Sequence, residues 1–397
     1  MPAVVVGGSL NSLGVIRSLA CDRMPLYLLE RSRRCAGFWS RHCRFVQTPA
    51  RGGPALIDAL VRLAEELNCR PVLILTSDHA VAAVSTDRER IESHYRIALP
   101  PPAMVRILAD KVSFQAFAER EHFPVPHAKA VCDEADLPQL SELAPPLILK
   151  PADKKLVEEG VVERTARADT IEEARIQGAR MLRRAGSVIV QEWIEGGDEE
   201  LFFTLFSCDR RGQVVGMFTG RKLLCWPPGV GYTTICVAAP EAATELEAMT
   251  RAMIVRTEYR GLGGMEFKRQ AGSGRFLMIE PTVGRTDWQE EIASLCGVNL
   301  PLLTYRAELG EPLPAPPPPR DRIAWRSSRQ YRVRPATAEP RLHVVDGHFR
   351  WSDPLPGFYF YAYERGAVRL WRGLTRLIRV RPVAPRVPRS LGQAVEE

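Results

Sequence analysis

The chain has 397 residues, of which 45% are apolar and 25% charged, and its formal net charge is +7. These values are typical of a globular protein, and the length allows two or three domains with cores of their own. No apolar run approaches the roughly 20 residues that span a bilayer, and the first residues carry no basic leader. We therefore expect a cytoplasmic protein.

The positive charge is concentrated towards the C-terminus. Residues 320–389 contain sixteen arginines, no lysine and five acidic residues, a balance of +11. Because the two final glutamates contribute −2, the first 319 residues carry a net charge of −2. This larger part has no patch of alternating basic and aromatic residues, which argues against a nucleic-acid partner. Nine scattered cysteines lack CxxC and Cys/His ligand spacings, so we expect reduced thiols.

Residues 1–102 alternate between short apolar runs and amphipathic stretches. Helices are expected over 13–21 and 54–67, between strands formed by AVVVGG, PLYLLE and PVLILTSD. Alternating units of this length predict a parallel sheet covered by helices on both faces. The glycine-rich GGSLNSLG lacks the GxGxxG spacing of a dinucleotide loop, so we favour a tight turn that lines a substrate cleft.

Asp78 and His79 follow the last of these predicted strands. They would lie at the carboxyl edge of the sheet, where open α/β sheets bind ligands, although simple capping of a loop fits their position equally well. Three consecutive prolines at 100–102 then interrupt the pattern and indicate a domain boundary.

Two lysines stand out in the next segment. An amphipathic helix is expected from Met104 to the prolines at 124 and 126, and it contains Lys111, which such a helix would normally expose. Lys150 closes the apolar strand PPLILKP. Because an unpaired ammonium group is costly in a protein interior, a buried Lys150 requires a partner such as a phosphate.

Further charged residues flank two later strands. The segment SVIVQEWIEGGDEELFFTLF predicts a strand, an acidic break and a second strand. Glu192, Glu199 and Glu200 could accept hydrogen bonds from an adenine amino group or ribose hydroxyls, or they could belong to a solvated turn. Arg221 and Lys222 precede a Pro/Gly-rich loop, where two cations suit an anionic substrate unless they are simply exposed.

The stretch GGMEFKRQAGSGRFLMIEPTVGRTDWQ reads as a β-hairpin with two carboxylates. Its strands MEFKR and RFLMIE are joined by QAGSG, which places Glu266 and Glu280 on adjacent antiparallel strands. Neighbouring carboxylates can share Mg²⁺, which fills its other positions with water and phosphate oxygens. Arg285 follows and could neutralise charge during phosphoryl transfer. The alternative is a surface hairpin with solvated glutamates.

In this order the segments resemble the ATP-grasp superfamily, and within it the carboxylate–amine ligases related to D-aspartate ligase, D-alanine–D-alanine ligase and the carbamoyl-phosphate-synthase-like proteins. The matching segments are ADKVSFQAF, PPLILKP, VQEWIEGGDEEL, GRKLLCWPPGVG, MEFKR and MIEPTVGR. The resemblance covers about residues 1–310. It implies mixed α/β and α+β architecture: a Rossmann-like domain over 1–102, and an ATP-grasp domain whose small α+β lobe (103–190) and antiparallel-sheet lobe (191–310) clasp ATP.

The resemblance also assigns roles to individual residues. Those matching the nucleotide-binding positions are Lys111, Lys150, Glu192, Trp193, Ile194 and Glu200. Lys111 and Lys150 match the lysines that contact phosphate, and Glu192 to Ile194 match the hinge that reads adenine. Glu200 matches the ribose ligand, with Asp198 and Glu199 as neighbouring alternatives. The resemblance implies Mg²⁺ or Mn²⁺ at Glu266, Glu280 and Thr282. The catalytic set is Arg285, Arg221 and Lys222, of which Arg285 matches the arginine that stabilises the transferred phosphate.

The chain departs from the family at two places. The family commonly has Glu-x-Asn-Pro-Arg where this chain has EPTVGR, so Thr282 offers a hydroxyl instead of an amide oxygen and Arg285 is displaced by one residue. Asp-Lys-Lys also replaces the usual Gly/Ser-rich flap after Lys150. These departures leave open an ATP-binding scaffold or regulator with impaired catalysis.

The function that the resemblance favours is an ATP-dependent ligase. Such an enzyme activates a small-molecule carboxylate as an acyl phosphate and lets an amine attack it. The resemblance suggests an amino acid or peptide-like substrate, with ATP and a divalent cation as cofactors.

The C-terminal part lies beyond the resemblance. Residues 311–320, EPLPAPPPPR, predict a stiff linker. Residues 321–397 then predict a small β-rich appendage that ends in a basic amphipathic helix over 365–381, with arginines opposite leucines. That helix could lie on the inner membrane face as a peripheral contact, or dock on the body of the protein.

Overall fold

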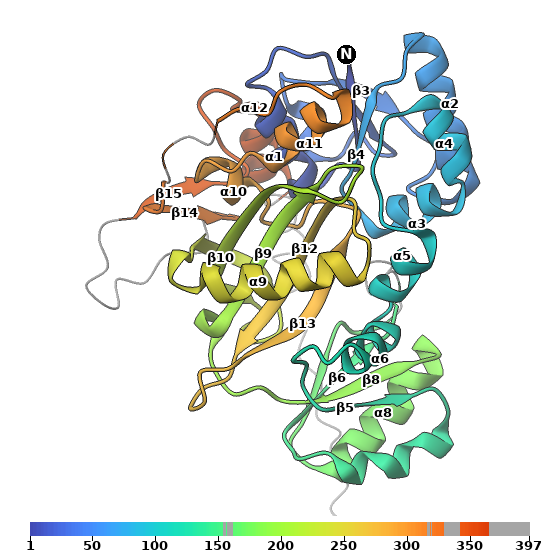
Figure 1. Cartoon of the computed structure of the whole chain (residues 1–397), viewed down its shortest axis with the longest axis vertical. Coiled ribbons are helices and arrows are strands. Elements are labelled where there is room, and N and C mark those ends of the chain that lie inside the picture. The colour runs from blue at the N-terminus through green and yellow to red at the C-terminus, as the bar shows by residue number, and fades with distance from the viewer. Residues whose placement is uncertain (154–155, 157–161, 316–317, 319, 329–341, 365–397) are drawn as a thin grey trace, which may run out of the picture.

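A computed structural model describes residues 1–153, 156, 162–315, 318, 320–328 and 342–364. The expected linker lies partly outside the described residues, as does the loop after Lys150, and the expected basic helix over 365–381 lies wholly outside them. Figure 1 shows the first domain at the top, a large sheet in the middle and a small lobe at the bottom.

The first domain contains a parallel sheet in the order β3-β2-β1-β4. Its strands are β1 (Ala3–Val6), β2 (Leu26–Glu30), β3 (Arg44–Gln47) and β4 (Val72–Leu75). Its helices are α1 (Leu10–Leu19), α2 (Gly53–Leu67), α3 (Asp78–Thr86) and α4 (Arg88–His94). Val4 and Val6 pack with residues of α2, whereas Ala3 and Val5 pack with residues of α1. The expected parallel sheet with covered faces is confirmed.

The expected helix from Met104 is wrong as a single element. It is divided into α5 (Pro102–Ala109) and α6 (Lys111–Arg120). Between them Asp110 is extended, with φ −99° and ψ 126°, and its carboxylate accepts a hydrogen bond of 2.8 Å from the amide of Ser113. Asp110 therefore caps α6 and interrupts the helical path. Lys111 consequently lies in the first turn of α6.

The small lobe contains an antiparallel sheet in the order β5-β8-β6-β7. The strands are β5 (Ala128–Val131), β6 (Leu147–Pro151), β7 (Ala166–Ala168) and β8 (Val188–Glu192). Helix α8 (Ile171–Ala185) begins at a Thr170 cap and ends at Gly186 in the left-handed region, and its apolar face packs on Leu147 and Leu149. This is the expected small α+β lobe.

The large lobe is built on a seven-stranded sheet in the order β13-β12-β9-β10-β11-β14-β15. Five strands are β9 (Leu201–Cys208), β10 (Val214–Trp226), β11 (Tyr232–Ala238), β12 (Gly261–Arg269) and β13 (Phe276–Val283). Its helices are α9 (Pro240–Arg256), α10 (Glu291–Leu295) and α11 (Leu300–Leu309). Helix α9 runs across the strands at the front in Figure 1. The expected hairpin around residues 270–275 is confirmed by β12 and β13.

Residues of the expected appendage extend this same sheet. Strand β14 (Ile323–Arg326) pairs antiparallel with β11, and β15 (His343–Asp346) pairs parallel with β14. The chain continues into α12 (Leu355–Phe358) and a π-helical turn, Tyr359–Glu364. Trp325 on β14 is fully buried and donates its indole N–H to Glu291 of α10 at 2.9 Å. The C-terminal strands are therefore part of the core of the large lobe.

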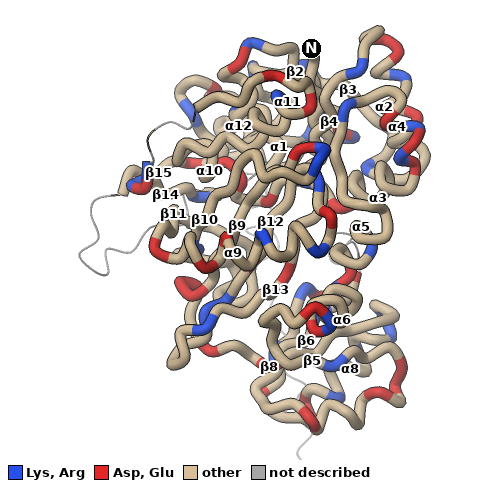
Figure 2. Tube along the Cα trace, in the orientation of Figure 1, with Lys and Arg blue, Asp and Glu red and all other residues tan. Residues whose placement is uncertain are grey.

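Basic and acidic residues are interspersed along the described trace, as Figure 2 shows. No helix within the described ranges is both long and apolar enough to cross a membrane. All nine cysteines are described and all are free thiols, as the sequence predicts.

Candidate active site

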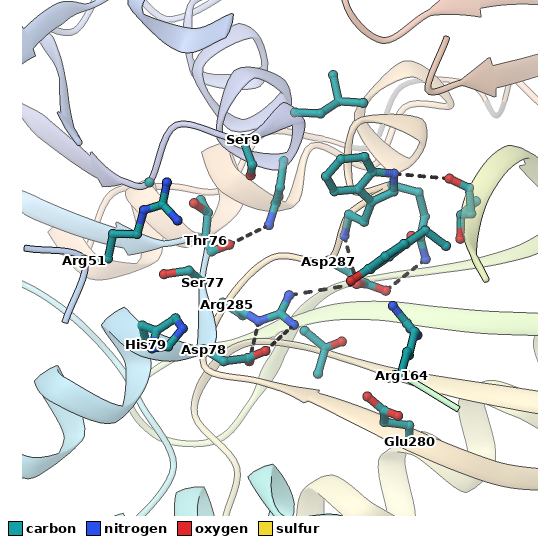
Figure 3. A pocket seen from close by; sticks show the side chains of 18 of the residues that line it. Ser9, Arg51, Thr76, Ser77, Asp78, His79, Arg164, Glu280, Arg285 and Asp287 are labelled. Atoms are coloured by element: carbon teal, nitrogen blue, oxygen red, sulfur yellow. Dashed lines mark hydrogen bonds and ion pairs between the residues drawn. The ribbon is translucent and has the colours of Figure 1, made fainter. Parts of the chain in front are cut away.

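A cavity of about 1660 Å³ is lined by residues of the first domain, both lobes and the segments that follow β14 and β15. The first domain contributes the loops that follow its strands, including residues 7–11 after β1 and 76–79 after β4. These loops lie at the carboxyl edge of the parallel sheet, where α/β proteins bind ligands. The glycine-rich turn therefore lines the cleft, as the sequence predicts (Figure 3).

Lys150 lines the cavity from β6 and is buried. Its ammonium group donates a hydrogen bond of 3.0 Å to the Oε1 atom of Gln191 on β8, and Gln191 in turn donates to Gln115 of α6 at 2.9 Å. Burial lowers the pKa of Lys150, while the carboxylates of Glu280 and Glu266 act in the opposite direction. The lysine is thus held rigidly beside two negative charges.

Glu266 and Glu280 occupy opposite positions on β12 and β13, and both line the cavity. The Nζ atom of Lys222 lies 2.5 Å from the Oε1 atom of Glu266, and the Nζ atom of Lys111 lies 3.9 Å from the Oε2 atom of Glu280. Four predicted site residues, separated by up to 169 positions in the sequence, therefore meet at one hairpin. Thr282 also lines the cavity, two residues beyond Glu280.

The neighbouring residues Arg221 and Lys222 point in different directions, because successive side chains of a strand alternate between its faces. Lys222 lines the cavity and is almost fully buried. Burial acts to lower the pKa of Lys222, but Glu266, together with Cys225 and Asp287, outweighs burial, and the pKa is raised. Arg221 is not among the lining residues and lies 4.0 Å from Glu241 of α9. Of this pair, the structure brings only Lys222 to the cavity.

The predicted adenine hinge, Glu192 to Ile194, lines the cavity at the end of β8. The Oε1 atom of Glu192 accepts a hydrogen bond of 2.9 Å from the amide of Ala144. Glu200 is not a lining residue, and its carboxylate forms an ion pair of 2.6 Å with Arg269.

Asp198, an alternative to Glu200 as ribose ligand, has a different set of contacts. Its carboxylate accepts hydrogen bonds from the amides of Cys225 and Gly229, at 2.7 and 2.6 Å. It is buried and does not line the cavity. These contacts connect Asp198 to the end of β10 and to the Pro/Gly-rich stretch that follows it.

Several lining residues were missed by the sequence analysis. Lys268 lies two positions after Glu266, and its Nζ atom is 4.5 Å from the ring centre of Trp193. Its spacing from Glu266 could have indicated the same strand face. Arg164 packs over Tyr232 with its Cζ atom 4.0 Å from the ring centre, and no sequence signal marked it. Burial acts to lower the pKa of Arg164, but Glu280 is foremost among the groups that raise it above its ordinary value.

The C-terminal segment also reaches the cavity, which the sequence did not predict. His348 and Phe360 are lining residues, and their rings stack with centres 3.5 Å apart. The Nδ1 atom of His348 lies 2.7 Å from the carbonyl oxygen of Ser327 at the end of β14. A cavity wall is therefore formed by residues outside the segments that resemble a known family.

Arg285 lies at the junction of the first domain and the large lobe. Its guanidinium group contacts both carboxylate oxygens of Asp78, at 2.6 and 3.0 Å, as the dashed lines in Figure 3 show. Asp78 and His79 both line the cavity, so the carboxyl edge of β4 contributes directly to the site. The arrangement gathers cations and two hairpin carboxylates in one cavity, which suits a nucleotide and a divalent metal.

Comparison with known proteins agrees with this arrangement, although no family model matches the chain. N5-carboxyaminoimidazole synthetase from Staphylococcus aureus has a similar structure, with a TM-score of 0.61 at 13% identity over 79% of this chain and 78% of that one. The MgADP-bound biotin carboxylase domain of Hydrogenobacter thermophilus 2-oxoglutarate carboxylase has a TM-score of 0.63 at 15% identity, covering 79% and 71%. This chain has the ATP-grasp fold.

A curated relative extends the comparison to sequence. D-aspartate ligase from Enterococcus faecium (strain Aus0004) is 25% identical to this chain over 318 residues, which are 75% of this chain and 74% of the relative. The resemblance to ATP-grasp carboxylate–amine ligases that the sequence motifs indicated is therefore confirmed.

Proposed function

We propose that this ATP-grasp protein is an ATP-dependent ligase that joins a carboxylate to an amine through an acyl phosphate. One observation carries the proposal: Glu266 and Glu280 face each other across β12 and β13 in a cavity that Lys150 and Arg285 also line. Two carboxylates with converging cations match the needs of phosphoryl transfer, in which charge must be held and neutralised.

The hairpin fits a divalent metal. Its two carboxylates are hard oxygen donors, each about a quarter exposed. Within the described residues no group of three or more His, Cys, Asp or Glu side chains is placed to hold a metal, so phosphate and water oxygens would complete the coordination of Mg²⁺. Glu266 and Glu280 would hold the ion, which would supply positive charge to neutralise part of the charge of the phosphates.

The chain's own residues would perform the remaining tasks. Lys150 and Lys111 bind phosphate oxygens, and the backbone of Ile194 recognises adenine. Lys222 holds Glu266 in the orientation that its short contact shows. Arg285 neutralises charge on the phosphoryl group as it passes to the carboxylate. The amine then attacks the acyl phosphate, forming the C–N bond as inorganic phosphate leaves and the amine loses a proton.

The similarity to D-aspartate ligase supports an amino acid as one substrate. The direct test measures phosphate release from ATP and Mg²⁺ with a panel of amino acids as carboxylates and amines. Turnover with any pair supports the ligase. Tight ATP binding without turnover by any pair would instead support the scaffold that the EPTVGR sequence leaves open.

Two variants test whether turnover depends on the β12–β13 hairpin. Glu280→Gln keeps the side-chain shape but removes one charge from the metal site, so we expect turnover to fall by at least about 100-fold while the protein stays folded. The matched control is Glu245→Gln on the exposed face of α9, outside the cavity lining. Activity of Glu280→Gln within about threefold of the control would show that the hairpin is not the metal site.

A further inference from the structure

We propose that Asp78, a residue of the first domain, positions Arg285 for the reaction; this inference rests on the proposed ligase function. Asp78 is the first residue of α3, and Arg285 follows β13, 207 positions later in the sequence. The Nε and Nη2 atoms donate to the two carboxylate oxygens at 2.6 and 3.0 Å, a two-point contact that fixes the plane of the guanidinium group.

The Asp78–Arg285 pair is shielded from solvent and lies at the cavity. Both side chains are 14% exposed, so the contact is shielded from water much better than a surface ion pair. Both residues line the cavity that also contains Lys150 and the glutamates of the β12–β13 hairpin. The third guanidinium nitrogen, Nη1, donates to the carbonyl oxygen of Thr286 at 2.9 Å.

The backbone at Arg285 explains why an external contact is needed. Strand β13 ends at Val283, and Gly284 adopts φ +65°, which favours glycine. A Cβ atom at Gly284 would lie 2.6 Å from a methyl group of Leu99, so the chain also passes close to the first domain. Because the strand has ended, sheet geometry no longer determines where the Arg285 side chain points, and Asp78 supplies that constraint.

A second contact ties the same loop to the first domain. The amide group of Asn11, in the first turn of α1, donates to the carbonyl oxygens of Thr286 and Thr76 at 2.8 and 3.2 Å. The hydroxyl of Thr286 donates back to Asn11 at 2.6 Å. Asn11 is 4% exposed. The carboxyl edge of the parallel sheet therefore holds the backbone of the Arg285 loop through Asn11 and its side chain through Asp78.

The charge of Asp78 predicts a characteristic kinetic signature. The carboxylate offsets part of the positive charge of Arg285, so its removal should not weaken the binding of an anionic substrate. It should, however, release the guanidinium from its fixed orientation and lower the rate of the chemical step. A loss in kcat without a rise in KM for ATP distinguishes a positioning residue from one that binds the nucleotide.

The test compares Asp78→Asn, Arg285→Ala and the double variant with Asp22→Asn. Asp22 forms a 2.7 Å ion pair with Arg306 of α11, and neither residue lines the cavity, so this control breaks a more exposed ion pair between the same parts of the chain. We expect Asp78→Asn to lower kcat at least about tenfold, with KM for ATP within about threefold and a melting temperature similar to that of the control. Asp22→Asn should retain wild-type kcat.

The double variant decides whether the effect passes through Arg285. If Asp78 acts by positioning, adding Asp78→Asn to Arg285→Ala should change kcat by less than about twofold. An equal loss in both backgrounds, or full activity of Asp78→Asn, overturns the proposal.

A spectroscopic measurement separates this proposal from the ligase function. The Nε–H group of Arg285 should give a slowly exchanging ¹⁵N side-chain signal, assigned by its loss in Arg285→Lys, that persists in Asp22→Asn and vanishes in Asp78→Asn. Persistence in Asp78→Asn overturns the positioning role. Absence of turnover by the wild type with every substrate pair overturns the ligase function, while the signal still decides whether Asp78 holds Arg285.

Discussion

Two buried ionisable side chains of this protein differ in how their charge is compensated. Lys222 is paired with Glu266. Glu290 is also buried, and its Oε2 atom has no hydrogen-bond partner among the described residues. Its Oε1 atom accepts a hydrogen bond of 3.1 Å from Ser294, and its neighbour in the chain is Glu291. Burial, reinforced by the charge of Glu291, raises the pKa of Glu290 to about 8.

The raised pKa predicts the direction of a pH effect on stability. Between its ordinary value of 4.5 and about 8, Glu290 is protonated in the native protein but ionised when unfolded. Because the native state binds the additional proton, its free energy of unfolding falls as pH rises through this window. Glu290→Gln should remove that loss, so its melting temperature should increasingly exceed that of the wild type from pH 5 to 8. Parallel melting curves over this range would contradict the prediction.

Lys150 allows a second prediction at the residue scale. Replacing it with methionine keeps much of the side-chain volume and removes the charge, so ATP affinity should fall by about 1.5–3 kcal/mol, the usual contribution of a charge-assisted hydrogen bond. Calorimetry with a non-hydrolysable ATP analogue measures this. Lys129→Met is the control in the same lobe, since Lys129 pairs with Glu142 outside the cavity lining. Equal affinities of the two variants would refute the phosphate-binding role.

At the scale of elements, one arginine connects the first domain to the C-terminal segment. Arg17 of α1 donates to the carbonyl oxygens of Gly347 and His348 at 2.7 and 2.8 Å, and to the carboxylate of Asp353 at 3.1 Å. Asp353 is 1% exposed and also accepts from Ser40 at 2.9 Å. This cluster holds the loop that carries His348 against the cavity.

Replacing Arg17 should lower the stability of the protein. Arg17→Met leaves a buried carboxylate and several carbonyl oxygens without their donor, so we expect the free energy of unfolding to fall by about 3–5 kcal/mol. Hydrogen exchange should show loss of protection in residues 343–358. The control Arg90→Met breaks a pair with Asp58 in which both side chains are nearly half exposed, and should cost less than about 1 kcal/mol. Similar losses in the two variants would show that the cluster does not anchor the segment.

At the scale of the whole molecule, the cavity exists only because four parts of the chain meet. Lining residues come from the carboxyl edge of the parallel sheet, the small lobe, the β12–β13 hairpin and the segments that follow β14 and β15. Figure 1 shows that β14 and β15 lie at one edge of the large sheet, with the first domain above it. The cavity therefore presents a ligand with residues from several parts of the chain at once.

The arginine-rich stretch 365–381 lies outside the described residues, and its sequence supports a test of the full chain. If it binds anionic lipid, each of its arginines should contribute about 1 kcal/mol, and the protein should co-sediment with phosphatidylserine vesicles at low salt but not at about 0.5 M salt. A protein ending at Glu364 should then stay in solution. If neither protein sediments and the shorter one melts several degrees lower, the stretch packs on the body instead.

Local features of the chain were largely predictable from sequence. The β12–β13 hairpin follows from two apolar runs around a glycine-rich turn, and the opposition of Glu266 and Glu280 follows from antiparallel pairing. The parallel sheet of the first domain follows from the alternation of strands and helices. Lys150 was identified because a lysine within an apolar strand is unusual. Each of these depends on residues close together in the chain.

Tertiary structure alone decided which charges meet. Asp78 and Arg285 are 207 positions apart, and nothing local indicates their contact. Lys222 reaches the cavity and Arg221 does not, because the orientation of β10 between β9 and β11 determines which face turns inward. Glu200 pairs with Arg269 across adjacent parts of the large lobe. Such pairings depend on how distant elements pack, and residue spacing along the chain carries no information about that packing.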